Sequence, residues 1–140
     1  MPTILLADDD GDLRALLARV LRSRGWTVRE SPDGTQALRA ALESPPDLAA
    51  LDESMPGLCG CGVCRELRAD PRTRGIAVLL MTGAPNEELQ RLDPPPDAWL
   101  AKPFRLAEFT EKAAELLAAS AARASARTDS RNRFPPPRRD

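Results

Sequence analysis

Short apolar runs alternate along this chain with segments of helical periodicity, and this alternation is the feature that most limits the fold. Each run is four to six residues long, which is typical of a strand buried on both faces of a parallel sheet. Between the runs, apolar residues recur at the spacing of a core-facing helix. The predicted strands are residues 4–7, 26–29, 48–52, 76–81 and 98–101. The pattern predicts an α/β domain in which five helices cover five parallel strands.

Polar residues follow three of these runs at the point where each strand ends. Asp8 and Asp9 follow the first strand. Asp52 ends the third strand, and Lys102 follows the fifth. Ligands bind outside the carboxyl ends of the strands in an open parallel sheet. We therefore expect one acidic cluster with one lysine at a single edge of the sheet.

The residue types in this cluster predict phosphoryl chemistry. Three carboxylates brought together repel one another, and a hard divalent cation relieves the repulsion. Magnesium prefers one or two carboxylates with water and a phosphate, so Asp9 and Asp52 are predicted ligands, with Asp8 acting directly or through water. Asp52 is the predicted nucleophile, because a carboxylate that attacks a phosphoryl group forms an acyl phosphate. Lys102 is expected to neutralise charge in the transition state, and the Thr82 hydroxyl to donate to the phosphoryl oxygens.

The composition excludes several other kinds of site. The chain contains no histidine, which excludes serine–histidine and cysteine–histidine nucleophiles and requires any phosphoryl donor to be another molecule. The contents of 42% hydrophobic and 29% charged residues are typical of a globular domain, and the formal net charge of −1 favours neither nucleic acid nor membrane as a partner. The N-terminus does not resemble a signal peptide, and an odd number of cysteines fits a reducing compartment, so a cytoplasmic location is expected.

The last twenty residues differ from the rest in composition. Residues 121–140 carry six arginines against two aspartates, whereas residues 1–120 are acidic. From Ala124 onward, arginine, serine and proline replace the apolar periodicity. We therefore predict one domain in residues 1–120 and a basic, Pro/Arg-rich disordered tail in residues 121–140. Contact of the tail with nucleic acid is an alternative, but a solvated tail is favoured because its only aromatic residue is Phe134.

The predicted site resembles the receiver domain of bacterial two-component response regulators, and most closely a single-domain, chemotaxis-type receiver. The similarity lies in Ile4–Asp10, the loop Asp52–Gly60, Thr82 and Lys102-Pro103-Phe104, and it extends over about residues 2–120. The resemblance implies a flavodoxin-like, doubly wound sheet with strand order 2-1-3-4-5. It also implies magnesium-dependent phosphoryl transfer to Asp52 from a sensor histidine kinase or a phosphotransfer protein, followed by slow self-hydrolysis. No other stand-alone enzymatic activity is expected.

The resemblance also implies roles for further residues. The backbone carbonyl of Ser54 is a metal ligand, Thr82 and Trp99 form the switch, and the Lys102–Pro103 peptide bond is cis. Trp99 replaces the family's usual tyrosine or phenylalanine, and Cys59 replaces a small polar or acidic residue, which affects the output face rather than the acceptor chemistry. Because no DNA-binding domain follows residue 120, we expect output through contact with an unknown protein, and a monomer or weak dimer.

Two other functions fit part of the pattern. Asp8-Asp9-Asp10-Gly11 also resembles the nucleophile motif of haloacid-dehalogenase-type phosphatases, in which Asp8 would attack and Asp10 would be the acid–base. Against this, Asp12 occupies the place of that motif's threonine, and Asp52 would have no role. Asp10 is instead favoured as a helix cap. The second alternative is a receiver-like interaction module that signals without phosphorylation.

Three cysteines, Cys59, Cys61 and Cys64, lie close together in the sequence. Thiolates at such short spacing bind zinc or form a disulfide. A fourth ligand is missing, however, and Cys64 falls on the apolar face of the third predicted helix. These two observations favour structural thiols over a metal or redox site.

Overall fold

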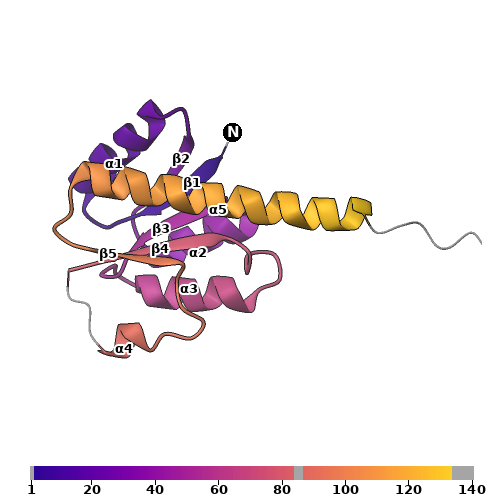
Figure 1. Cartoon of the computed structure of the whole chain (residues 1–140). Coiled ribbons are helices and arrows are strands. Elements are labelled where there is room, and N and C mark those ends of the chain that lie inside the picture. Colours follow the sequence, from indigo (N-terminus) through magenta and orange to yellow (C-terminus); the bar gives the residue numbers. More distant parts are fainter. Residues whose placement is uncertain (1, 84–86, 134–140) are drawn as a thin grey trace, which may run out of the picture.

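A five-stranded parallel sheet forms the centre of the molecule (Figure 1). The structure is a computed structural model that describes residues 2–83 and 87–133. The strands are β1 (Thr3–Ala7), β2 (Thr27–Ser31), β3 (Leu48–Asp52), β4 (Ala77–Thr82) and β5 (Ala98–Ala101). Their order in the sheet is β2-β1-β3-β4-β5, which confirms the predicted α/β class and strand order.

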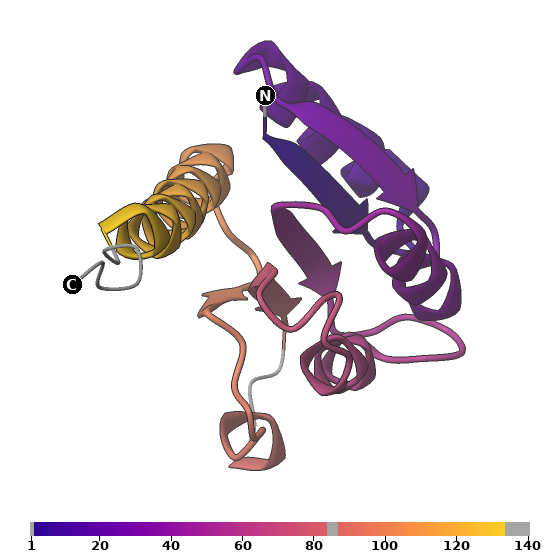
Figure 2. The same ribbon diagram turned by 90° about the vertical axis from the view of Figure 1, so that its right-hand side faces the viewer.

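Helices cover both faces of the sheet, as expected for a doubly wound fold (Figure 2). The helices are α1 (Gly11–Ser23), α2 (Gly34–Glu43), α3 (Gly60–Ala69), α4 (Glu87–Gln90) and α5 (Leu106–Arg133). On one face, Leu17 of α1 and Phe109 of α5 belong to the same buried cluster. On the other face, Ala37 of α2 and Val63 of α3 belong to a second buried cluster. Because both faces are covered, the central strands are mostly apolar, and every residue of β3 is buried.

Helix α4 is shorter than the other helices. The sequence predicts a helix near residues 87–92, but α4 is a single turn of 4 residues. In the described part of the chain, four helices of at least ten residues therefore cover the sheet instead of the five predicted. Three prolines at positions 94–96 follow closely, and proline cannot continue a helix because it lacks the backbone N–H.

Helix α5 is longer than the sequence predicts and projects beyond the sheet (Figure 1). It has 28 residues and ends at Arg133, so it passes the expected domain boundary at residue 120 and enters the segment expected to be disordered. Alanine and arginine are strong helix formers, and no proline or glycine interrupts the sequence before Pro135. The expected disorder of residues 134–140 falls outside the described residues. None of the described helices has the length and hydropathy needed to span a bilayer.

The register of the strands places their carboxyl ends side by side. Ala7 of β1 pairs with Leu51 of β3, and Asp52 pairs with Met81 of β4. Thr82, the last residue of β4, pairs with Ala101, the last residue of β5. The residues that follow these positions must therefore meet at one edge of the sheet.

Gly60, the first residue of α3, packs directly against the end of β3. A methyl group added at Gly60 would lie 2.6 Å from the Asp52 carbonyl oxygen and 2.7 Å from Leu80 Cδ1. Cβ atoms do not approach other heavy atoms this closely in proteins. Only glycine therefore allows α3 to begin so near to Asp52. The same glycine donates its backbone N–H to the Glu53 carbonyl oxygen at 3.1 Å.

We expect Gly60→Ala to destabilise the protein by about 1–3 kcal/mol, because the strand backbone must move to admit the methyl group. Gly75→Ala is the matched control, since an added methyl group there has nothing within 4 Å. Its effect should stay within about 0.5 kcal/mol. Urea unfolding of the two variants and the unchanged protein measures both values. Equal stabilities of the two variants would show that α3 does not depend on this close approach.

Candidate functional site

Lys102 joins two of the predicted aspartates at the carboxyl edge of the sheet. Its Nζ lies 2.9 Å from Asp52 Oδ1 and 3.3 Å from Asp8 Oδ2. Asp8 and Asp52 are buried, whereas about a quarter of the Lys102 side chain is exposed. The three residues come from the ends of β1, β3 and β5, as the sequence predicts.

Asp9 completes a cluster of three carboxylates. One oxygen from each of Asp8, Asp9 and Asp52 lies within 4.8 Å of the others, and Asp9 is exposed to solvent. An all-oxygen donor set with an open side fits a hard cation such as magnesium, which keeps several of its waters. The residues present therefore fit the predicted metal, and the role of the Ser54 carbonyl stays a prediction.

The electrostatics of the cluster reflect crowding of like charges. Burial raises the pKa of Asp52, and the charges of Asp8 and Asp9 raise it further, while the hydrogen bond from Lys102 opposes both effects. Burial by itself lowers the pKa of Lys102, but its hydrogen bonds and its attraction to Asp52 and Asp8 outweigh burial, so the net direction is upward. Lys102 is thus held in its charged form, and the cluster gains from any further cation.

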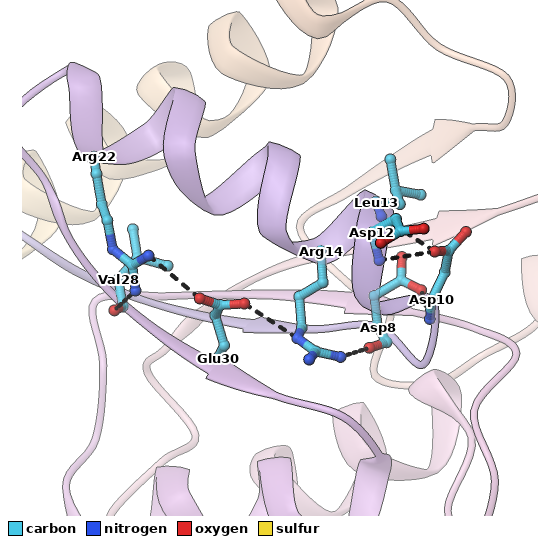
Figure 3. Close-up of polar contacts among 8 residues, drawn as sticks. All are labelled: Asp8, Asp10, Asp12, Leu13, Arg14, Arg22, Val28 and Glu30. Carbon is cyan, nitrogen blue, oxygen red and sulfur yellow. Dashed lines mark hydrogen bonds and ion pairs between the residues drawn. The ribbon is translucent and has the colours of Figure 1, made fainter.

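Asp8 is held in place from both sides, as Figure 3 shows. Its carboxylate oxygen Oδ1 accepts a hydrogen bond from the backbone N–H of Asp10 at 2.9 Å. Its backbone carbonyl accepts one from Arg14 Nη1 at 2.7 Å. Asp10 in turn caps α1, because its Oδ1 accepts from the backbone N–H groups of Asp12 and Leu13, each at 3.1 Å. The preference for Asp10 as a cap is therefore confirmed.

Arg14 is a supporting residue that the sequence reasoning missed. Besides Asp8, it contacts Glu30 of β2, with Nε 3.2 Å from Oε1 (Figure 3). Glu30 also pairs with Arg22 at 3.3 Å, and Arg22 donates to the Val28 carbonyl at 2.9 Å. This chain of contacts ties α1 to β2 behind the acidic cluster. Its only sequence signal is that the two arginines are eight residues apart, so they lie on the same face of α1.

Thr82 and Trp99, the predicted switch residues, lie on neighbouring strands. Thr82 is buried at the end of β4, and its carbonyl accepts a hydrogen bond from the Lys102 backbone N–H at 2.8 Å. Trp99 lies within β5 opposite Leu80 and packs, half-buried, against the apolar cluster under α2 and α3. The Lys102–Pro103 bond is cis, which confirms that expectation.

Comparison with known proteins gives the same family that the residues of the site resemble. The chain matches the family model of the response regulator receiver domain over residues 4–114, and it belongs to this family. It is 39% identical to the transcriptional regulatory protein PrrA of Mycobacterium tuberculosis, with 83% of this chain and 50% of PrrA covered. It is 36% identical to the DNA-binding dual master transcriptional regulator RpaA of Synechocystis sp., with 84% of this chain and 49% of RpaA covered.

A solved structure supports the same assignment. The receiver domain of the sensor histidine kinase PA1611 from Pseudomonas aeruginosa, which has a magnesium ion coordinated in its active site cleft, has a TM-score of 0.76 and 28% identity to this chain. The similarity covers 84% of this chain and 98% of that one. By contrast, the chain spans about half the length of the curated relatives it matches.

We expect Asp9→Asn to raise stability in metal-free buffer by about 0.5 kcal/mol, because it removes one of three crowded charges. The same variant should lose most of the stabilisation that added magnesium gives. Thermal melts with and without magnesium measure both effects. Asp10→Asn is the control, because it removes one charge nearby but leaves a good helix cap. A metal-free Asp9→Asn protein that melts no higher than the unchanged one would contradict the crowding.

Proposed function

We propose that this chain is a phosphoacceptor receiver whose Asp52 takes a phosphoryl group from a sensor histidine kinase or a phosphotransfer protein. The observation that carries the proposal is the contact of Lys102 Nζ with both Asp52 and Asp8 beside the exposed Asp9. These residues supply a nucleophile, a fixed positive charge and an open carboxylate cluster at one edge of the sheet. Because residues 1–140 contain no histidine, the donor imidazole lies outside this segment.

Each residue has a defined task in the transfer. A carboxylate oxygen of Asp52 attacks phosphorus, a P–O bond forms, and the P–N bond to the donor imidazole breaks, which leaves an acyl phosphate on Asp52. Lys102 neutralises charge that develops on the phosphoryl oxygens, and the Thr82 hydroxyl donates a hydrogen bond to one of them. Asp9, Asp52 and the Ser54 carbonyl, with Asp8 close by, would hold magnesium, which would supply further charge neutralisation. Slow hydrolysis of the acyl phosphate returns the protein to its starting state.

The phosphatase alternative fits the geometry less well. In that mechanism Asp10 would be the acid–base, but its carboxylate already caps α1 through two backbone N–H groups. Asp8, the supposed nucleophile, is completely buried and accepts a hydrogen bond from Asp10. Asp52 would have no role in it. The magnesium ion in the PA1611 receiver supports the metal proposed here.

The output of this receiver in our proposal is a contact with another protein in the cytoplasm. RpaA binds DNA, and PrrA is a transcriptional regulator, but the region they share with this chain is about half of each protein. A monomer or weak dimer is sufficient for this output. A module that signals without phosphorylation would need no Lys102 contact with Asp52.

Incubation with magnesium and a small phosphodonor should add one phosphoryl group to the chain, and Asp52→Asn should abolish the gain without unfolding the protein. Asp8→Asn should only slow it. Intact mass spectrometry measures the product, and mild alkali should erase the mass shift because an acyl phosphate is base-labile.

The control variants separate the alternatives. Phosphate release that persists in Asp52→Asn and disappears in Asp8→Asn would establish the phosphatase. No mass gain in the unchanged protein, with either the small donor or a panel of sensor kinases, would leave the interaction module as the function. If kinases of the panel phosphorylate Asp52, the one with the highest rate of transfer is identified as the partner.

We also expect Trp99 to remain partly exposed after activation. An indole is larger than the phenol or phenyl ring usual at this position, and overpacking a core costs about 1–3 kcal/mol. With Trp26→Phe, Trp99 is the sole fluorophore, and its quenching by iodide should change little when a phosphoryl mimic and magnesium are added. The Trp99→Phe protein, which reports Trp26 before β2, is the control. A large loss of Trp99 quenching on activation would show that the ring becomes buried.

A further inference from the structure

Two cysteines and a glutamate meet between the end of β3 and the first turn of α3. Cys59 Sγ and Cys61 Sγ are 2.9 Å apart. Glu53 Oε1 accepts a hydrogen bond from the Cys61 backbone N–H at 2.8 Å. The two sulfurs and a carboxylate oxygen of Glu53 all lie within 4.8 Å of one another, and all three residues are half-buried. This cluster is separate from the carboxylates of the acceptor site.

The backbone of the loop holds the two thiols on the same side. Gly60 lies against the Asp52 carbonyl, and a methyl group at Gly62 would lie 2.6 Å from Leu58 Cδ1. Both glycines therefore face packed atoms, while the cysteines between and before them remain partly exposed. Cys59 is also the N-cap of α3, and its sulfur accepts from the Gly62 backbone N–H at 3.3 Å.

The third cysteine has a different environment. Cys64 is completely buried in the apolar cluster under α2 and α3. The expectation that it packs in the core is therefore confirmed. The sequence offers three cysteines and no fourth ligand. In the structure Glu53, which the sequence spacing does not indicate, joins Cys59 and Cys61 in place of Cys64.

The cluster lacks a positive partner in the described part of the chain, where no lysine or arginine forms an ion pair with Glu53. We propose that Cys59, Cys61 and Glu53 bind a thiophilic divalent cation of the zinc type. Two thiolates, one carboxylate and one water make a four-coordinate site with an open position, a ligand number that zinc accepts. Binding releases the two thiol protons to solvent, and the cation takes the place of the sulfur–sulfur hydrogen bond.

The donor atoms distinguish this site from the acceptor site. Magnesium prefers oxygen ligands, whereas thiolates select zinc and similar soft cations. The proposal does not depend on phosphorylation of Asp52, so each can fail without the other.

Cobalt titration of the full chain tests the proposal. The protein is reduced with a phosphine, stripped with a chelator and placed in excess magnesium, so that the carboxylate cluster is saturated. One equivalent of Co²⁺ should produce thiolate-to-cobalt charge-transfer absorption, and Zn²⁺ should remove it by displacement. Cys59→Ser and Cys61→Ser should each abolish the charge-transfer band. Glu53→Gln should weaken Co²⁺ binding, but the band should still appear at higher Co²⁺ concentration.

Cys64→Ala is the matched control, because it removes a thiol outside the cluster, and its band should equal that of the unchanged protein. Circular dichroism verifies that each variant is folded. A thiol assay on a denatured sample, taken before the phosphine is added, should find three free thiols. Finding one would identify a Cys59–Cys61 disulfide instead, and an absent charge-transfer band or a band lost only in Cys64→Ala would equally overturn the metal site.

Discussion

The cluster of aspartates at the edge of the sheet depends on the ammonium group of Lys102. Two carboxylates buried next to each other are costly unless a positive charge is close to both. Lys102 meets this need for Asp8, which is 94 residues away in the sequence, and for Asp52. A lysine suits the position because its compact charge contacts two separate oxygens, whereas an arginine fork is shaped for one carboxylate. The lysine thus fixes the edge of the sheet, and in the function proposed here it would also neutralise charge on a phosphoryl group.

The strand order sets how far that lysine must reach. β3 and β5 are separated by β4, so two strand spacings of about 4.8 Å lie between their ends. A long side chain from the edge strand can cross this distance, and it passes the end of β4, where Thr82 is buried. The Lys102 backbone N–H already bonds the Thr82 carbonyl. Lys102 therefore links Asp52 to β5, the strand that carries Trp99, and also to Thr82 at the end of β4.

The sequence predicts those parts of the molecule that depend on periodicity and strand ends. Apolar runs of strand length place Asp8, Asp52 and Lys102 at one edge, because parallel strands share the direction of their carboxyl ends. Contacts between side chains of different helices and strands produce no comparable pattern in the sequence. The bond from Arg14 to the Asp8 carbonyl and the approach of Glu53 to the cysteines both depend on the exact turn of the chain after a strand. The extent of α5 is hard to predict for another reason, because arginine and serine enrichment is typical of disorder whereas alanine favours helix.

The end of β3 explains how two chemically different clusters lie one residue apart. Side chains alternate in direction along a strand, so Asp52 and Glu53 leave the backbone on different sides. Asp52 joins the other carboxylates and Lys102, and Glu53 joins the thiols at the start of α3. Gly60 holds both arrangements, because it contacts the Asp52 carbonyl and bonds the Glu53 carbonyl. A shift of the Asp52 backbone must therefore move the start of α3, and a cation bound by Glu53 and the cysteines would resist that shift. The two clusters would then select different cations because one offers oxygen donors and the other offers sulfur donors, even though they lie close together.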